Sequence, residues 1–293
     1  MELFLAQLIN GISIGSIYAL VALGYTMVYG IVKLINFAHG DIIMVGAYVM
    51  FFLMRHVGVP FVPAVFLTMA ACAILGVAMD QIAYRPLRKA TRLSALITAI
   101  GVSLFLQNSF MVVMGSSPRP FPALSLPGHI QIFGGVTVSN LTVVTIVASL
   151  ITMGLLQLIV KKTRVGKAMR AVSEDSGAAA LMGVNVNVTI AVTFAIGSAL
   201  AAVGSALYAS TFPVIDPFMG MMLGLKAFVA AVVGGIGIIP GAMLGGFLLG
   251  IAESLTAAYI SSQLVDAVVF SMLIVVLLFK PAGILGTYAG EKV

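Results

Sequence analysis

The sequence predicts an all-α fold, a polytopic integral membrane helical bundle with about 8–10 transmembrane helices, some of which could be discontinuous. Hydrophobic residues make up 61% of the 293 residues and charged residues only 8%, whereas soluble domains are roughly 45–50% apolar and about 25% charged. With so few charges to cover a water-exposed surface, lipid must be the solvent for much of the chain. The apolar segments are long and do not alternate, which favours helices over the strands of an outer-membrane barrel.

A helix needs about 20 apolar residues to cross a hydrocarbon core of roughly 30 Å. Candidate spans run approximately over residues 5–31, 37–54, 61–83, 94–114, 141–160, 187–210, 219–237, 240–258 and 264–280. Two of them are weak, because 37–54 holds a polar motif and 219–237 is short and Gly-rich. Either could be discontinuous, a form tolerated at depth where protein or a water-filled cavity satisfies the backbone. We interpret residues 1–293 as a single transmembrane domain.

Basic residues set the predicted topology, since loops rich in Lys and Arg stay on the cytoplasmic side. Two loops qualify: about 84–93, with Arg85, Arg88, Lys89 and Arg92, and about 161–187, with Lys161, Lys162, Arg164, Lys167 and Arg170. The loop between them, about 115–140, is rich in proline and carries Arg119 as its only Lys or Arg. We therefore predict that this loop is external. The C-terminus, with Lys280 and Lys292, is then inside, and the N-terminus is outside if every candidate span crosses. The net charge of +6 reflects this topology, and nucleic acid is not an expected partner.

The stretch from 234 to 246 is Gly-rich, but the chain contains no G-x-x-x-x-G-K-[ST] phosphate loop there or elsewhere. We therefore expect no nucleotide-hydrolysing site in this polypeptide. Glycines spaced at four positions let helix backbones approach closely in lipid. We accordingly predict that helix packing is the role of Gly237, Gly241, Gly245 and Gly250. The alternative is a cavity-lining break around Pro240.

Residues 33–48, KLINFAHGDIIMVGAY, set Asn36, His39 and Asp41 in an apolar neighbourhood. Asn36 is a good N-cap and the chain after it reads as a fresh helix, so we predict a helix break here. The break could lie at the cytoplasmic interface, with Asp41 paired to a cation. Alternatively it lies deeper, where the polar groups line a path or fix one helix against another. No metal site is expected, because a His and an Asp two positions apart point to different faces of a helix.

Other polar residues lie within the predicted spans. Tyr18 and Tyr25 are seven positions apart on one helix face, where they could line a path or make interhelical hydrogen bonds. Glu253, Asp266 and Lys226 are costly in lipid, so we expect them to face protein or water. Sequence spacing does not indicate which acid pairs with Lys226.

Six sequence blocks cover nearly the whole chain and occur in the order found in LivH-type permease subunits of bacterial branched-chain amino acid ABC importers. They are GSIYALVALGYTMVYGIVKLINFAHGD, AYRPLR, LITAIGVSLFLQN, TRVGKAMRAVSEDSGAAALMGV, LKAFVAAVVGGIGIIPGAMLGGFLLGIAES and PAGILG. The chain thus resembles that family. The resemblance implies a multi-pass permease of the bacterial inner (plasma) membrane, not an enzyme.

The resemblance also implies a set of partners besides membrane lipid. A second homologous permease subunit would form a heterodimer with this chain, and two ABC ATPase subunits would bind ATP, so no cofactor is expected in this chain. A periplasmic amino-acid-binding protein would deliver leucine, isoleucine or valine. Because NFAHG is a hallmark block of the family, we predict that Asn36, His39 and Asp41 hold a hinge or gate. Further pathway candidates are Tyr18, Tyr25 and Glu253.

The segment GAAALMG, residues 177–183, resembles the A-A-x-x-x-G core of the EAA loop through which many ABC permeases touch their ATPases. Gly177 stands where that motif has Glu, so the usual polar anchor is absent. The acidic residues just before the segment suit the N-terminus of a short helix. The predicted ATPase-docking loop therefore contains Gly177, Ala178, Ala179 and Gly183, with an ordinary surface helix as the alternative.

Two other functions stay open at this point. An ion-coupled secondary transporter should show paired broken helices and a carboxylate in each half. Asp41 and Glu253 fit that pattern loosely, although no internal repeat is visible. Within the ABC class, permeases for urea or short amides are the nearest alternative, because substrate choice lies largely with the binding protein.

Overall fold

The computed structural model describes residues 2–88, 90–122, 128–132 and 136–286. Lys89 and Lys292, which belong to the predicted cytoplasmic basic segments, lie outside this part of the chain. The long helices are α1 (Glu2–Val32), α2 (His39–Phe52), α3 (Phe61–Met79), α4 (Arg92–Met114), α5 (Asn140–Lys162), α8 (Val186–Thr211), α9 (Met219–Gly234), α10 (Ile239–Tyr259) and α11 (Val265–Phe279). Two short helices, α6 (Arg164–Glu174) and α7 (Ser176–Leu181), connect α5 to α8.

Several helices continue beyond these bounds as short 3-10 or π-helical turns. A π-helical turn, Leu53–Val57, extends α2, and the turns Asp80–Tyr84 and Arg85–Leu87 extend α3. A 3-10 turn, Ser262–Leu264, precedes α11. With these extensions, 8 helices in the described residues are long and apolar enough to cross a membrane. The polytopic helical class predicted from composition is thereby confirmed.

The helix α9 is the exception among the predicted spans. Its 16 residues correspond to about 24 Å at 1.5 Å per residue, which is less than a hydrocarbon core of roughly 30 Å. The predicted weak span 219–237 is therefore a short helix that ends in a turn before α10. The other weak segment, 37–54, forms a helix of full length once its π-helical extension is included.

The central element is α1, which packs against α10, α8, α9 and α5. Every residue from 15 to 28 is buried, so this helix is enclosed on all sides rather than along one stripe. The first ten residues of α2 are buried in the same way, between α8, α9 and α3. A helix that is apolar and buried all round marks the core of the bundle.

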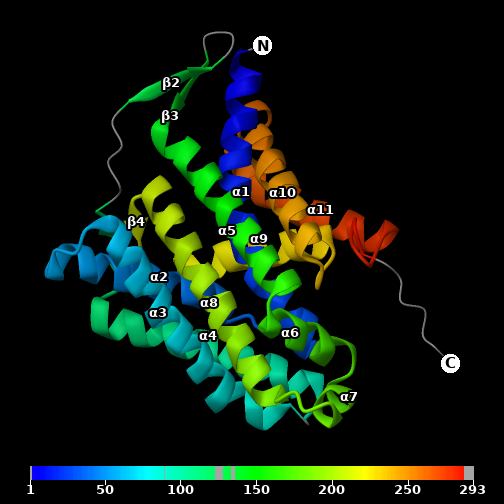
Figure 1. The fold of residues 1–293 in the computed structure, drawn as a ribbon. Helices are drawn as coiled ribbons and strands as arrows, with labels where there is room; N and C mark the ends of the chain where they lie inside the picture. Colours follow the sequence, from blue (N-terminus) through cyan, green and yellow to red (C-terminus); the bar gives the residue numbers. More distant parts are fainter. Residues whose placement is uncertain (1, 89, 123–127, 133–135, 287–293) are drawn as a thin grey trace.

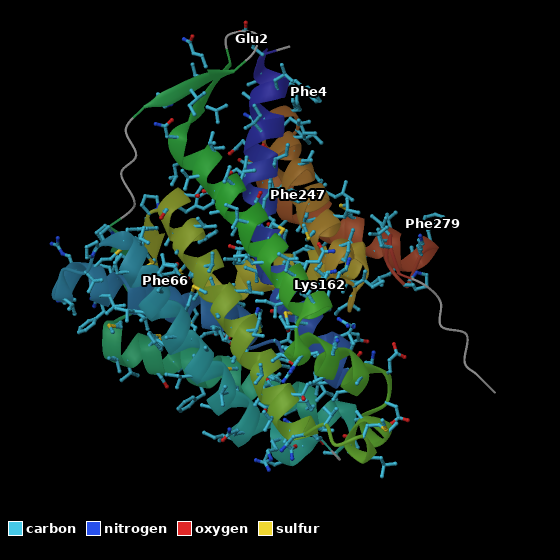
Figure 2. The ribbon with its side chains drawn as sticks, viewed as in Figure 1. Glu2, Phe4, Phe66, Lys162, Phe247 and Phe279 are labelled. Atoms are coloured by element: carbon cyan, nitrogen blue, oxygen red, sulfur yellow. The ribbon has the colours of Figure 1, made fainter. Side chains whose placement is uncertain are left out.

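The outer helices expose apolar side chains. Phe105 on α4 is 70% exposed and Phe279 at the end of α11 is 85% exposed, and Figure 2 shows Phe279 projecting away from the bundle. Such surfaces suit lipid or other membrane-embedded subunits.

Two small β-ladders lie among the loops. Strands β2 (His129–Ile132) and β3 (Val136–Ser139) form an antiparallel hairpin before α5. Strand β1 (Arg119–Pro120) pairs with β4 (Val214–Ile215), which joins the segment after α4 to the segment after α8.

The hairpin of the predicted external loop and the short helices of the predicted cytoplasmic loop lie at opposite ends of the bundle, while the side of the membrane on which each end lies stays a prediction. Figure 1 shows the N-terminus and the β2–β3 hairpin at one end, and α6 and α7 at the opposite end. The two basic loops also meet, because Arg88 donates to Asn187 Oδ1 at 2.5 Å. Arg88 additionally holds Asp80 at 2.6 Å, so the end of α3 and the start of α8 are tied together by one guanidinium.

Candidate functional site

The break between α1 and α2 begins at Lys33, whose backbone adopts a left-handed conformation with φ of 56°. This conformation is unfavourable for a residue with a side chain, but it ends α1 sharply while Lys33 N–H still donates to Tyr29 O at 2.8 Å. The predicted helix break is present. The predicted N-cap is wrong, because α2 begins at His39 with Ala38 at the cap position and no side-chain cap.

Asn36 has a different partner instead. Its Oδ1 accepts a hydrogen bond of 2.5 Å from the Tyr84 hydroxyl at the end of α3. Both side chains are buried, and the Tyr84 ring packs on Phe194 of α8 with 5.4 Å between centroids. The amide that sequence reasoning placed at a helix terminus therefore fastens the α1–α2 segment to α3 and α8.

His39 faces α1. Its imidazole meets the Tyr25 ring edge-on with 4.8 Å between centroids. The ring fits because position 24 is glycine: a Cβ at Gly24 would lie 2.1 Å from His39 Nε2. That nitrogen is buried and has no hydrogen-bond partner among the described residues.

Asp41 faces α4. Gln107 Nε2 donates to Asp41 Oδ1 at 2.8 Å and to Ser103 Oγ at 3.2 Å. An interfacial Asp41 paired with a cation, one of the two interpretations of the sequence, is not what the structure shows. Asn36, His39 and Asp41 are 3%, 1% and 1% exposed, and each contacts a different neighbouring helix. They fix one helix against others, as the second interpretation expected.

The first turn of α2 also lies directly against α9. A Cβ at Gly40 would be 2.4 Å from Gly220 O, and one at Gly224 would be 2.7 Å from Gly40 Cα. The six residues from Asn36 to Asp41, which we call the α2 junction, therefore contact α1, α3, α4 and α9. A shift of this segment would therefore change its contacts with all four helices.

A cavity of about 310 Å³ lies beside this junction, between α1, α4, α9 and the segment before α2. Its wall is apolar and formed by Phe37, Leu96, Ile100, Leu104, Met221 and Leu225. Tyr25, Ser103 and Gln107 also line it, but the surface that the cavity presents is almost entirely apolar. The Gln107 side chain thus borders the cavity and also holds Asp41.

A second polar cluster joins α1, α9, α10 and α11. Lys226 Nζ lies 2.7 Å from Glu253 Oε1 and 2.9 Å from Asp266 Oδ1. The Tyr18 hydroxyl donates to Glu253 Oε2 at 2.7 Å. We call Tyr18, Lys226, Glu253 and Asp266 the charged cluster. Helical side chains lean toward the N-terminus of their helix, so Tyr18 and Glu253, on antiparallel helices, lean toward each other.

The structure therefore separates the pathway candidates into two groups. Tyr25 joins His39 at the α2 junction, whereas Tyr18 and Glu253 belong to the charged cluster. The pairing of Lys226 was missed because its acids lie 27 and 40 positions later in the chain, beyond any local spacing rule.

The connection between α5 and α8 carries the predicted docking residues. Asp175 caps α7 by accepting from Gly177 N at 2.7 Å and Ala178 N at 2.9 Å. Ala179 is buried, and Gly183 has φ of 85°, a turn conformation that favours glycine. Of the four predicted docking residues, only Ala179 is buried, while Gly177, Ala178 and Gly183 are exposed.

The outer surface of the same segment was not foreseen. Leu181 is 91% exposed and Met182 is 84% exposed at the end of α7. The sequence feature that could have indicated this surface is the pair of neighbouring apolar residues in a loop predicted to face the cytoplasm. Two such side chains in water form a small contact patch, since exposed apolar residues that cluster indicate an interaction site. We call Leu181 and Met182 the α7 tip.

The predicted packing glycines fall into two kinds. Gly241, Gly245 and Gly250 lie in α10 where an added Cβ would collide with backbone atoms of α9 or α1. Gly237 lies outside a helix, in the turn before α10, with φ of 93°. The turn ends where α10 begins, and Pro240 occupies the first turn of α10, a position that proline favours.

The chain is similar to known proteins along nearly its whole length. A family model described as "Branched-chain amino acid transport system / permease component" matches residues 7–278. The chain is 46% identical over 303 aligned residues to the Pseudomonas aeruginosa protein BraD, described as a high-affinity branched-chain amino acid transport system permease protein, and the match covers 99% of this chain and 98% of that protein. It is 44% identical to LivH of Escherichia coli K12, with 99% and 98% covered. A probable branched-chain amino acid transport permease protein of Methanocaldococcus jannaschii is 30% identical, with 92% and 89% covered.

Proposed function

The chain belongs to the branched-chain amino acid transport permease family, and on that premise we propose that it forms the membrane path for leucine, isoleucine or valine in an ABC importer. The observation that carries this proposal is the 46% identity to a permease of that description along 99% of the chain. The chain is a transport subunit of the bacterial inner membrane and not an enzyme.

The sequence has no phosphate-binding loop, so the ATP hydrolysis that we propose as the energy source would take place on other subunits. A permease of an ABC transporter works with ATPase and substrate-binding partners. We propose two ATPase subunits that bind ATP, a periplasmic binding protein, and a second homologous permease that forms a heterodimer with this chain. No cofactor is proposed in this chain itself.

The proposed ATPase contact is the α5–α8 connection, with the α7 tip as its outermost apolar surface. Leu181→Glu and Met182→Glu are each expected to lower co-purification of the ATPases at least about tenfold. The reason is that placing a charge in a desolvated contact costs well over 1.4 kcal/mol, the equivalent of a factor of about ten. The measurement is the ATPase-to-permease ratio after affinity purification of the assembled importer.

Ile130→Glu is the matched control for the α7 tip, because Ile130 is an exposed apolar residue, 45% exposed, on the β2–β3 hairpin at the other end of the bundle. This control is expected to retain the ATPases. Equal retention by Leu181→Glu, Met182→Glu and wild type would remove the α7 tip from the proposed contact.

The α2 junction is the proposed hinge or gate. Asn36→Ala, His39→Ala and Asp41→Ala are each expected to lower uptake at least about fivefold, since losing a buried hydrogen-bond or packing partner costs roughly 1–3 kcal/mol. Asn108→Ala is the control: Asn108 neighbours Gln107, is exposed, and among the described residues donates to Leu104 O of its own helix. Wild-type uptake by all three junction variants in the assembled importer would show that the junction has no role in transport.

The proposed function itself is tested by reconstitution. The two permeases, the ATPases and the binding protein are assembled in liposomes, and uptake of labelled leucine is measured with and without ATP inside. Accumulation that requires ATP supports the proposal. Accumulation driven by a proton or sodium gradient without ATP would favour an ion-coupled transporter, and uptake of urea in place of leucine would assign the chain to the amide permeases.

A further inference from the structure

The cavity beside the α2 junction adjoins a second one, which lies nearer the start of α4. The second cavity has a volume of about 340 Å³. Its lining comes from the end of α1 and the residues after it, among them Tyr29 and Lys33, and from the first turns of α4, among them Leu93 and Leu96. Leu96 lines both cavities. We call the two cavities together the α4 groove.

The part of the α4 groove beside the α2 junction is almost wholly apolar and open at the side of the bundle. Ile100, Leu104 and Met221 of its wall are 46%, 53% and 54% exposed. The groove follows α4 from residue 93 to residue 107, which is about 21 Å at 1.5 Å per residue. Half of a hydrocarbon core is roughly 15 Å. The groove is therefore long enough for a fatty acyl chain of one leaflet.

The other part of the α4 groove carries a positive charge. Lys33 lines it, is exposed, and makes no ion pair with any residue that the structure describes. No acidic side chain is among the described residues that line the two cavities. The backbone of Lys33 is left-handed, a conformation that glycine adopts more readily. A strained residue of this kind points to a use for its side chain.

The charged part of the groove lies at the predicted cytoplasmic end of the bundle. The helix α4 begins at Arg92, at the end of the basic loop of about 84–93 that we predict to be cytoplasmic. Acidic phospholipids of the cytoplasmic leaflet attract basic residues at this depth, and tyrosine, here Tyr29, is typical of the membrane interface. A lysine above an open apolar groove therefore matches an anionic headgroup attached to an acyl chain.

From these observations we propose that the α4 groove binds one phospholipid with an acidic headgroup, its phosphate at Lys33 and one acyl chain along α4 beside the α2 junction. A lipid supplies the anion and the apolar chain in one molecule, whereas an apolar helix of another subunit would leave Lys33 without an anion. The site does not depend on which solute the chain transports.

The bound chain would also contact the proposed hinge. Phe37 lies between Asn36 and His39 in the sequence and lines the groove. Its ring packs on Phe228 of α9 with 5.7 Å between centroids. A lipid in the groove would therefore hold the α2 junction against α4 and α9.

The first test measures binding of phosphatidylglycerol and of phosphatidylcholine to the purified full chain by native mass spectrometry. Wild type is expected to bind one phosphatidylglycerol more tightly than phosphatidylcholine. Lys33→Gln should weaken phosphatidylglycerol binding about fivefold, the effect of one basic residue near an acidic lipid, and should change phosphatidylcholine binding less. Leu104→Trp fills the groove and should weaken binding of both lipids.

Each variant has a matched control. Lys162→Gln also removes one positive charge, from an exposed residue at the end of α5 that does not line the groove. Val112→Trp introduces the same side chain on α4 at a position that is 81% exposed and outside both cavities. Both controls should bind the two lipids as wild type does. If Leu104→Trp does not fold, Lys33→Gln and its control decide the question.

A second test identifies the occupant in cell membranes. A photo-reactive phenylalanine analogue in place of Leu104 is expected to become attached to phospholipid. Attachment to another protein subunit would show that a partner covers the groove and would overturn the inference. Equal wild-type affinity for the two lipids, or variants that bind phosphatidylglycerol as tightly as their controls, would overturn it as well. None of these results bears on leucine uptake, so the proposed function is tested separately.

Discussion

Gly250→Ala is expected to force α1 and α10 apart and to lower the free energy of unfolding by about 3 kcal/mol or more, the upper range for overpacking a close-packed interior. An added Cβ would lie 2.3 Å from Gly15 N and 2.4 Å from Gly11 O. Both are backbone atoms of a buried helix, so no side chain can rotate away. The two helices must separate, and close contact between backbones is a main source of helix association in lipid.

Gly154→Ala provides the control with the same chemical change. Gly154 lies in α5, and an added Cβ there meets nothing within 4 Å. Alanine in a helix is favoured over glycine by about 1 kcal/mol, so this variant should be neutral or more stable. The measurement is thermal unfolding of the purified chain in detergent. Equal melting temperatures for the two variants would contradict the close α1–α10 contact.

Lys226→Met is expected to be similarly damaging. The substitution leaves Glu253 and Asp266 without their cation, and Glu253 is only 16% exposed. Removing one partner of a buried pair typically costs about 3–5 kcal/mol, and the upper part of this range is not expected because Asp266 is half exposed. Purified yield and thermal stability of the chain should both fall.

A second substitution should restore much of the loss. Lys226→Met combined with Glu253→Gln removes the buried charge that the single variant leaves unpaired, while the amide oxygen introduced by the second change can still accept from the Tyr18 hydroxyl. Replacing both members of a buried pair is often close to neutral. If the double variant were as unstable as Lys226→Met alone, the effect would come from lost packing around Lys226 and not from the unpaired acid.

Features that depend on composition and local order could be predicted from the sequence. Lipid imposes long apolar helices, so the helical class follows from the residues near each position. The break before α2 was visible because polar residues interrupt an apolar run. The packing role of Gly241, Gly245 and Gly250 followed from their spacing.

Features that depend on which helices lie side by side could not be predicted. Asn36 looked like an N-cap because its local sequence fits one, but the nearby Tyr84 hydroxyl of another helix is its actual partner. The contact between Asp41 and Gln107 joins residues 66 positions apart. Local spacing likewise identified the loop at Gly177 to Gly183, while only the folded arrangement shows that Ala179 is inside and Leu181 outside.

The space that Gly24 leaves for the imidazole of His39 makes the residue allowed at position 24 depend on the residue at position 39. With Nε2 of His39 only 2.1 Å from where a methyl group at position 24 would lie, position 24 can gain no side chain while the imidazole keeps this place. A homologue that acquires a side chain at position 24 must shrink the residue at position 39 in compensation. An imidazole in this orientation at position 39 therefore requires glycine at position 24.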